Sequence, residues 1–272
     1  MATMDWGSQA DSGAANYEEF LVPAMFAPFA ERLVEQGGVS PGSVVLDVAC
    51  GTGAVSRAAA RRAGATGSVT GADLGGPTLA IARSHVIDDG AAPIEYVQSD
   101  ATALPFDDAT FGVVLCQQGL QFFPDRPAAL GEMRRVLKTG GRLALATWKN
   151  IEHSPFMAVA DALASHISLE ASEMMRSPFG LSDASELARV LSAAGFQDVG
   201  VEDETIECTW ASHPQFARRL IEAGPVASLF AAADETTKRR FTDEVAARLA
   251  PNATADGQLR MTMTSNIALA RA

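Results

Sequence analysis

The sequence predicts an α/β fold built on a doubly wound, mostly parallel sheet, and three observations support this. The 272 residues are 47% hydrophobic and 20% charged, a balance that can bury a full core and excludes disorder for most of the chain. Short runs rich in apolar and β-branched residues alternate with helical stretches, as is typical of βαβ units. Glycine and proline mark the boundaries between these elements.

The first predicted helix lies ahead of the sheet. Residues 1–15 are small and polar, whereas Tyr17 to Glu35 carry hydrophobic residues at helical spacing. We expect the strands that follow to be covered on both faces by the helices between them. The predicted parallel strands are VVLDVA (44–49), SVTGADL (68–74), IEYVQSDA (94–101), FGVVLCQQ (111–118) and GRLALATW (141–148).

Capping and turn residues mark the helices between these strands. Pro77 is expected in the first turn of one helix, and Pro127 follows Asp125 at the start of another. Gly140 with Gly141 is expected to end that second helix.

The pattern changes after the fifth predicted strand, with longer helical stretches and two late alternating runs. The predicted elements are a long helical region (154–176), a helix opened at Ser182 that ends at Gly195, an exposed or edge strand (199–210), a further helical stretch (214–249) and a last alternating strand (259–270).

Charge and cysteine content exclude several classes of protein. The net charge of -12, from 21 Lys+Arg against 33 Asp+Glu, argues against a nucleic-acid partner. No apolar run reaches the roughly 18 to 20 residues of a membrane span, and the start lacks the pattern of a secretory signal, so a cytoplasmic location is expected. The three cysteines, Cys50, Cys116 and Cys208, have no CxxC spacing and predict reduced, buried thiols and no metal site.

The most informative segment is LDVACGTG (46–53), where a strand leads into a glycine turn and then a helix. Gly51 and Gly53 allow the backbone to approach a ligand closely, and the helix presents unpaired N–H groups. A dinucleotide-binding GxGxxG motif is incomplete here, because Ser56 stands at its third glycine. Asp47, inside the strand, would repel a pyrophosphate and attract a cationic ligand.

Polar residues also follow the next three strands. Asp73 ends the second strand, where a carboxylate can accept hydrogen bonds from both hydroxyls of a ribose. Asp100 with Ala101 ends the third strand, and Gln117 with Gln118 ends the fourth. Because the carboxyl ends of parallel strands meet at one edge of the sheet, these residues are expected to share a crevice.

With these motifs the chain resembles the class I S-adenosylmethionine-dependent methyltransferases, in the small-molecule group that includes the ubiquinone and menaquinone C-methyltransferases. The resemblance implies a Rossmann-like doubly wound seven-stranded sheet in the order 3-2-1-4-5-7-6, with strand 7 antiparallel and helical cap insertions. The two late alternating runs would then be strands 6 and 7. The segments that carry the resemblance, within about residues 40–150, are VLDVACGTG, VTGADLGGPTLAIAR, YVQSDATALPF, FGVVLCQQGLQFFPD and ALGEMRRVLKTGGRLALATW.

A division of the chain follows from this resemblance. Residues 1–40 would form an N-terminal helical segment that contributes to the cap, and residues 41–272 the methyltransferase domain. Helical insertions are expected in that domain at about 151–180 and 214–250.

The resemblance also implies a binding site for S-adenosylmethionine. Asp47 would lie near the amino group of the methionine part, Asp73 would bind the ribose, and Leu74 would pack on the adenine. Tyr17 would reach the carboxylate from the N-terminal helix, and relatives often carry Met where this chain has Thr78. The residues expected to bind the cofactor are Tyr17, Asp47, Ala49, Gly51, Thr52, Gly53, Asp73, Leu74, Asp100, Ala101 and Gln117.

Methyl transfer depends mainly on positioning, because the cofactor supplies the reactivity. If a general base is needed, His153, just beyond the fifth strand, is the candidate among four histidines. Aromatic and methionine side chains in the segments outside the sheet favour an apolar or aromatic substrate. The expected substrate-pocket residues are Phe26, Gln118, Phe122, Phe156, Met157 and Phe179.

The expected function is therefore S-adenosylmethionine-dependent C- or O-methylation of a small metabolite, with S-adenosylhomocysteine as the product. Two alternatives stay open at this point. A nucleotide-binding oxidoreductase is disfavoured by the missing third glycine and by Asp47, and a module that binds the cofactor without turnover would share the same fold. The expected partner is a small molecule, and a homodimer is compatible with the sequence.

Overall fold

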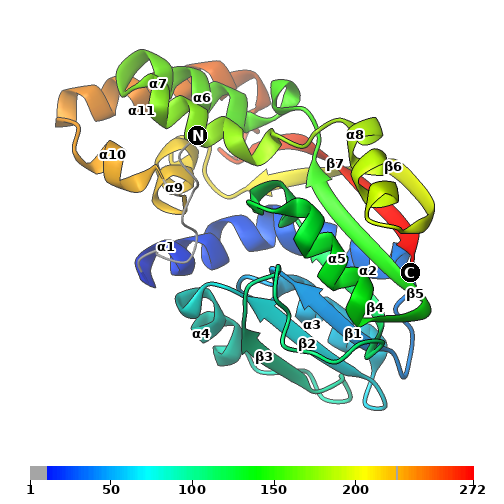
Figure 1. Cartoon of the computed structure of the whole chain (residues 1–272). Coiled ribbons are helices and arrows are strands. Elements are labelled where there is room, and N and C mark those ends of the chain that lie inside the picture. The colour runs from blue at the N-terminus through cyan, green and yellow to red at the C-terminus, as the bar shows by residue number, and fades with distance from the viewer. Residues whose placement is uncertain (1–10, 225) are drawn as a thin grey trace.

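The computed structural model describes residues 11–224 and 226–272, apart from the side chains of Asp11, Ser12 and His153. Its centre is one sheet of seven strands. The strands are β1 (Val44–Val48), β2 (Ser68–Asp73), β3 (Ile94–Gln98), β4 (Phe111–Gln117), β5 (Leu137–Trp148), β6 (Gln197–Trp210) and β7 (Leu259–Arg271). They follow the order β3-β2-β1-β4-β5-β7-β6, as Figure 1 shows.

The strand directions confirm the predicted sheet. β1 to β5 run parallel to one another, whereas β7 runs antiparallel to both β5 and β6. β6 pairs only with β7, so the alternating run that ends at Trp210 is the edge strand that its pattern predicts. The central strands β1 and β4 are almost fully buried, which explains their continuous apolar sequence.

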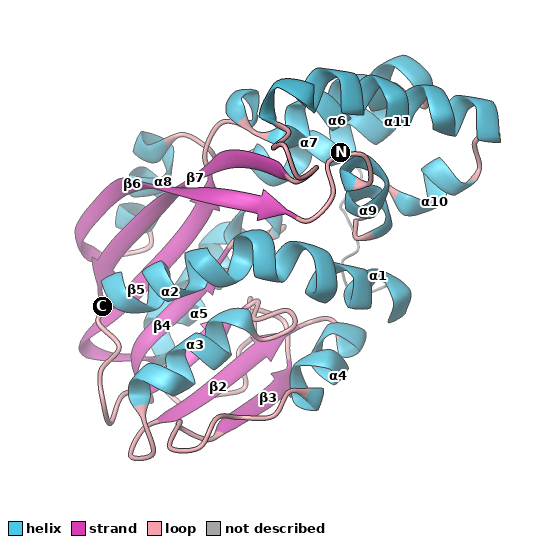
Figure 2. Cartoon of the chain, turned by 180° about the vertical axis from the view of Figure 1, so that it is seen from behind, coloured by secondary structure: helices cyan, strands magenta, loops and turns pink. Residues whose placement is uncertain are grey.

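Helices cover both faces of the sheet (Figure 2). One face packs on α2 (Ala27–Gln36) and α3 (Ala54–Ala63), and the other packs on α5 (Arg126–Val136) and α8 (Ala184–Ala193). Adjacent residues of β1 point to opposite faces, with Val45 in the first core and Leu46 in the second. The helix α4 (Gly76–Ser84) lies beside β2 and β3, with Pro77 in its first turn as predicted.

A separate group of helices, here called the cap, lies beyond the carboxyl ends of the parallel strands (Figure 1). Its members are α6 (Pro155–His166), α7 (Leu169–Arg176), α9 (Phe216–Glu222), α10 (Ala227–Ala231) and α11 (Glu235–Leu249). The predicted region 154–176 is thus two helices, because Ser168 caps a new helix by accepting a hydrogen bond from the Ala171 N–H at 3.1 Å. Short 3₁₀ helices at Leu120–Phe122, Ile151–His153, Ser177–Phe179 and Ala250–Asn252 connect the larger elements.

The N-terminal helix reaches from one face of the sheet to the cap helix α9 (Figures 1 and 2). It comprises α1 (Asp11–Asn16), the π-helical segment η2 (Tyr17–Phe26) and α2. The wider π-helical turn contains Pro23, which has no N–H to donate to the preceding turn. Its Leu21 and Met25 pack into the same core as the cap.

One boundary prediction is wrong. The helix α5 ends at Val136, and Gly140 and Gly141 lie inside β5 instead of ending the helix. The pairing of β5 with β4 jumps between Phe111 and Val113, so the glycines belong to an irregularity of the strand. Gly140 has a φ of +73°, a left-handed conformation that glycine adopts in one class of β-bulge.

None of the helices in the described ranges is long and apolar enough to cross a membrane.

Candidate functional site

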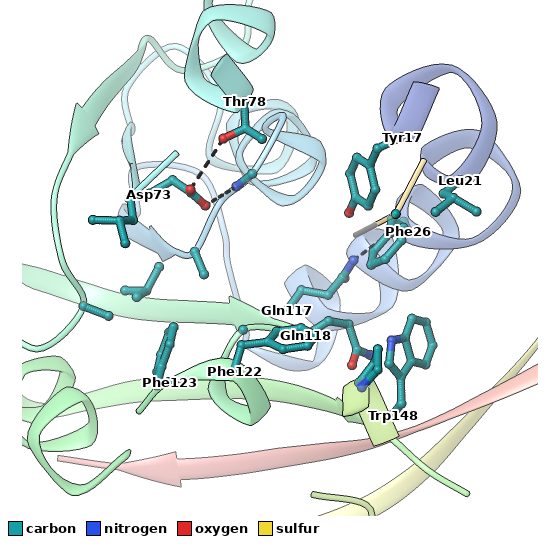
Figure 3. A pocket seen from close by; sticks show the side chains of 18 of the residues that line it. Tyr17, Leu21, Phe26, Asp73, Thr78, Gln117, Gln118, Phe122, Phe123 and Trp148 are labelled. Atoms are coloured by element: carbon teal, nitrogen blue, oxygen red, sulfur yellow. Dashed lines mark hydrogen bonds between the residues drawn. The ribbon is translucent and has the colours of Figure 1, made fainter. Parts of the chain in front are cut away.

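A cavity of about 620 Å³ opens where the parallel strands β1 to β4 end. The strand ends form its floor, and the N-terminal helix forms one wall through Tyr17, Leu21 and Phe26 (Figure 3). Residues of the cap, among them Phe156 and Met174, close the far side. The site therefore lies at the edge of the sheet where the sequence places its polar residues.

The glycine bend after β1 leaves room for a ligand. Ala49, Gly51 and Gly53 have left-handed φ values of 56°, 54° and 86°. No atom lies within 4 Å of the place where a Cβ on Gly51 would be, so the backbone there is open to the cavity. At Gly53 a Cβ would meet the Tyr96 hydroxyl, and the left-handed φ of 86° also favours glycine there.

Asp73, at the end of β2, faces the cavity and organises the bend (Figure 3). Its Oδ2 accepts a hydrogen bond from the Gly51 N–H, and its Oδ1 accepts one from the Gly75 N–H, both at 2.8 Å. Thr78 donates to the Gly75 carbonyl at 2.7 Å and lies 3.5 Å from Oδ1. Burial raises the pKa of Asp73, while the two backbone donors oppose that shift.

Asp47 is a second carboxylate behind the bend, and it is fully buried. Its Oδ2 accepts a hydrogen bond from Ser56 at 2.6 Å, whereas its Oδ1 has no partner among the described residues. Burial raises the pKa of Asp47 to about 7, and the charge of Asp73 adds to the shift against the Ser56 hydrogen bond. Burying the charge of a carboxylate is costly unless the group is protonated or gains a partner.

The end of β3 supplies the next part of the rim. Leu74, Asp100 and Ala101 all line the cavity. The Leu74 side chain is 55% exposed, an uncovered apolar surface on which a flat ring could pack. Asp100 accepts hydrogen bonds from the N–H and hydroxyl of Thr102, both at 2.8 Å, and the pKa of Asp100 is lowered by them.

The end of β4 joins the sheet to the N-terminal helix. Gln117 donates from Nε2 to the Phe26 carbonyl at 2.9 Å, while its buried Oε1 has no partner among the described residues. Gln118 has a φ of +57°, and its Nε2 donates to the Ser265 hydroxyl at 2.8 Å. Tyr17 packs its ring 4.8 Å from that of Phe26, and burial raises the pKa of Tyr17 well above its usual value.

The remaining lining is mostly apolar and includes only part of the predicted substrate pocket. Phe26, Phe122 and Phe156 line the cavity together with Gln118. Met157 and Phe179 do not line it. The next residue along α6 lies about 100° around the helix from Phe156, and the Met157 sulfur accepts a hydrogen bond from Arg176.

Phe179 lies in the packing behind the wall. Its ring is 5.7 Å from that of Phe156 and 6.4 Å from that of Trp148. Of the predicted cofactor residues, Asp47, Thr52 and Gly53 also lie behind the cavity surface, whereas the other predicted cofactor residues line it.

Several residues that line the cavity were not predicted from the sequence. Leu21 and Met25 follow Tyr17 at helical spacing, a signal that would have placed them on the same wall. Trp148 is the last residue of β5, at the same sheet edge as the other strand ends. Leu220 and Val226 come from the cap and carry no local signal.

None of the three histidine side chains that the structure describes, His85, His166 and His213, lines the cavity. The side chain of His153, the candidate base, lies outside the described residues. His85 lies 2.9 Å from Glu18, and His166 lies 2.6 Å from Glu244.

Comparisons with known proteins match this arrangement. A model of the ubiE/COQ5 methyltransferase family matches residues 29–214. The ubiquinone/menaquinone biosynthesis C-methyltransferase UbiE of Shewanella halifaxensis is 38% identical over 129 residues, which is 47% of this chain and 51% of that protein. UbiE of Paraburkholderia phymatum is 37% identical over 143 residues, 52% of this chain and 58% of that protein. The chain spans about half the length of the curated relatives it matches.

Solved structures share the fold. A structure titled as a putative methyltransferase from Bacillus halodurans aligns with a TM-score of 0.59 and 23% identity, covering 89% of this chain and 97% of that one. Phosphoethanolamine N-methyltransferase 2 of Haemonchus contortus, solved with S-adenosyl-L-methionine, aligns with a TM-score of 0.63 and 20% identity, covering 98% of this chain and 58% of that one.

The match to the family model takes in most of the chain and every strand end that forms the floor of the cavity. The chain therefore belongs to the ubiE/COQ5 methyltransferase family.

Proposed function

We propose that the protein transfers a methyl group from S-adenosylmethionine to carbon or oxygen of a small, apolar or aromatic metabolite. The observation that carries the proposal is the division of one cavity into two chemically different halves. Carboxylates and an open glycine bend line the half at the strand ends, and aromatic and methionine side chains line the half under the cap. The net charge of -12 further supports a small-molecule acceptor over a nucleic acid.

The residues at the strand ends fit this cofactor. Asp47, behind the bend with an unpartnered Oδ1, would supply negative charge on the side of the amino group of the methionine part. The open space at Gly51 suits a ligand in contact with the backbone. Asp73 would bind the ribose, and the uncovered Leu74 would pack on the adenine. The residues that would hold the cofactor are Tyr17, Asp47, Ala49, Gly51, Thr52, Gly53, Asp73, Leu74, Asp100, Ala101 and Gln117.

The protein's part in the reaction is positioning. When bound, S-adenosylmethionine supplies an electrophilic methyl group on a positively charged sulfur that leaves as a neutral thioether. Phe26, Phe122 and Phe156 would hold the acceptor against the strand ends and exclude water from the cavity. Fixing two reactants in line is worth on the order of 7 to 11 kcal/mol. For an acceptor that must lose a proton, His153 stays the candidate base.

The domain organisation follows from the same proposal. The N-terminal segment would comprise residues 1–40, of which Tyr17, Leu21 and Phe26 line the cavity. Residues 41–272 would form the methyltransferase domain, with insertions at about 151–180 and 214–250. The insertions contribute the cap residues that line the apolar half.

Ligand binding tests the cofactor assignment. S-adenosylhomocysteine should raise the melting temperature with increasing concentration, because a ligand that binds only the folded state stabilises it by mass action. NAD and NADP should leave the melting temperature unchanged. The reverse result would support the oxidoreductase alternative and reject the proposal.

Turnover is tested separately, with methyl-labelled S-adenosylmethionine and a set of small aromatic and quinone-like acceptors. Transfer of label to an acceptor supports the proposed reaction. Binding without transfer to any acceptor or to cell extracts would point to the alternative, a cofactor-binding module without activity.

A further inference from the structure

One side chain joins the glycine bend to the N-terminal helix. Arg57, in the first turn of α3, donates from Nη1 to the Thr52 carbonyl at 2.6 Å. From Nη2 it donates to Oε1 of Glu18 at 2.9 Å. Thr52 lies between Gly51 and Gly53, and Glu18 follows Tyr17, which lines the cavity. Arg57 therefore connects both sides of the proposed cofactor site.

The geometry favours a specific contact over a loose surface ion pair. The side chains of Arg57 and Glu18 are each only 18% exposed. A planar guanidinium fixes the directions of its donors, so it holds the carbonyl and the carboxylate in one relative position. His85, at the end of α4, lies 2.9 Å from the same Glu18 oxygen and adds a second contact to the helix.

The contact at Glu18 has a counterpart at the other end of η2, where Gln117 donates to the Phe26 carbonyl at 2.9 Å. Tyr17, Leu21 and Phe26, which line the cavity, all lie in the segment between or beside these two contacts. The wall is thus attached at one end to the strand β4 and at the other end to the glycine bend.

Arg57 is also the cation beside the carboxylates of the site. Burial, together with the charge of Asp73, raises the pKa of Asp47 to about 7, and the guanidinium of Arg57 opposes this rise. The same guanidinium opposes the rise in the pKa of Tyr17 that burial and the neighbouring carboxylates cause. Removing this charge would leave the buried Asp47 with less compensation.

From these contacts we propose that Arg57 is a positioning residue for cofactor binding, with Glu18 as its partner. It holds the glycine bend and the wall that carries Tyr17 in the single arrangement that the cofactor needs. This inference rests on the proposed function, since it concerns the same site. Arg57 itself does not line the cavity, so its effect passes through Thr52 and Glu18.

The test compares Arg57→Gln with a matched variant, Arg61→Gln. Arg61 lies one turn further along α3 and pairs with Glu31 of α2 at 2.5 Å, so its loss also removes an ion pair to the N-terminal helix but leaves the bend untouched. The measurements are the Kd for S-adenosylhomocysteine by calorimetry, and amide hydrogen exchange over residues 17–26 without ligand. Arg57→Gln and Glu18→Gln should each raise the Kd about tenfold and speed exchange, and Arg61→Gln should do neither.

The pairing is tested by combining the two changes. If Arg57 acts through Glu18, the effects of the two changes should not add. The Kd of the double variant for S-adenosylhomocysteine should then exceed the larger of the two single-variant Kd values by no more than about twofold. Arg57→Lys keeps the positive charge but loses the planar guanidinium that reaches both acceptors, so its Kd should lie between those of the wild type and Arg57→Gln. This variant replaces Arg57→Gln in the test if Arg57→Gln does not fold.

Two results would overturn the inference. The first is an Arg57→Gln or Arg57→Lys protein that melts at a lower temperature but keeps the wild-type Kd, which would make Arg57 purely structural. The second is equal behaviour of Arg57→Gln and Arg61→Gln in both measurements. These results can be distinguished from a failure of the proposed function, because in that case the wild-type protein itself would not bind S-adenosylhomocysteine.

Discussion

At the scale of single residues, the site contains two carboxylates with different roles, Asp73 and Asp47. Asp73 faces the cavity and holds two backbone N–H groups, so it shapes the bend and presents its oxygens to a ligand. Asp47 is hidden behind the bend with one oxygen unpartnered. The sequence predicts that both aspartates belong to the site, because each stands at or near the carboxyl end of a strand. Which of them faces the cavity required the structure.

Replacement of Asp73 tests the ribose assignment. We expect Asp73→Ala to weaken binding of S-adenosylhomocysteine by about 1 to 3 kcal/mol, because charge-assisted hydrogen bonds are lost. The control is Asp88→Ala, which removes an acidic side chain that is 67% exposed. Calorimetry should show normal affinity for the control, and normal affinity for Asp73→Ala would count against the assignment.

Asp47 makes stability depend on pH. Its pKa rises from an ordinary 3.8 to about 7 in the folded chain, so the folded state keeps a proton that the unfolded chain has released between these values. The stabilising contribution is complete below about pH 4 and is lost as the pH rises to about 7. In urea unfolding, wild-type protein should lose more stability between pH 5 and pH 8 than Asp47→Asn. Parallel pH profiles of the two proteins would contradict this origin.

At the scale of elements, local patterns predict the strands better than they predict the helix boundaries. Each central strand is buried on both faces and bounded by turn residues, so its sequence alone identifies it. The π-helical form of η2 and the bulge at Gly140 depend on contacts between distant segments, such as that of Gly140 with Ala272. Those contacts leave no periodic signal.

The glycine bend yields a prediction about backbone geometry. Gly53→Ala should lower the free energy of unfolding by about 1 to 3 kcal/mol, because its φ is +86° and the new Cβ would meet Tyr96. Gly131, exposed in α5 with no atom near its Cβ position, is the matched site. Gly131→Ala should stabilise by roughly 0.5 to 1 kcal/mol. Equal stabilities of the two variants in denaturant unfolding would refute the strain argument.

At the scale of the whole molecule, the cavity is completed by segments that lie far apart in the sequence. The floor comes from the sheet, one wall from the N-terminal helix, and the far side from the cap (Figures 1 and 3). The family motifs identify the floor from sequence alone. The wall and the cap residues could be predicted only in part, as Met157 and Phe179 illustrate, because a helix's orientation depends on what it packs against.

The central claim is that the strand-end half of this cavity binds a sulfur nucleoside. A crystal structure with S-adenosylhomocysteine tests it most directly. The account predicts the nucleoside at the carboxyl ends of β1 to β4, with its ribose on Asp73 and its adenine against Leu74. A nucleoside found at another place on the protein, or a cavity that stays empty at saturating ligand, would contradict the account.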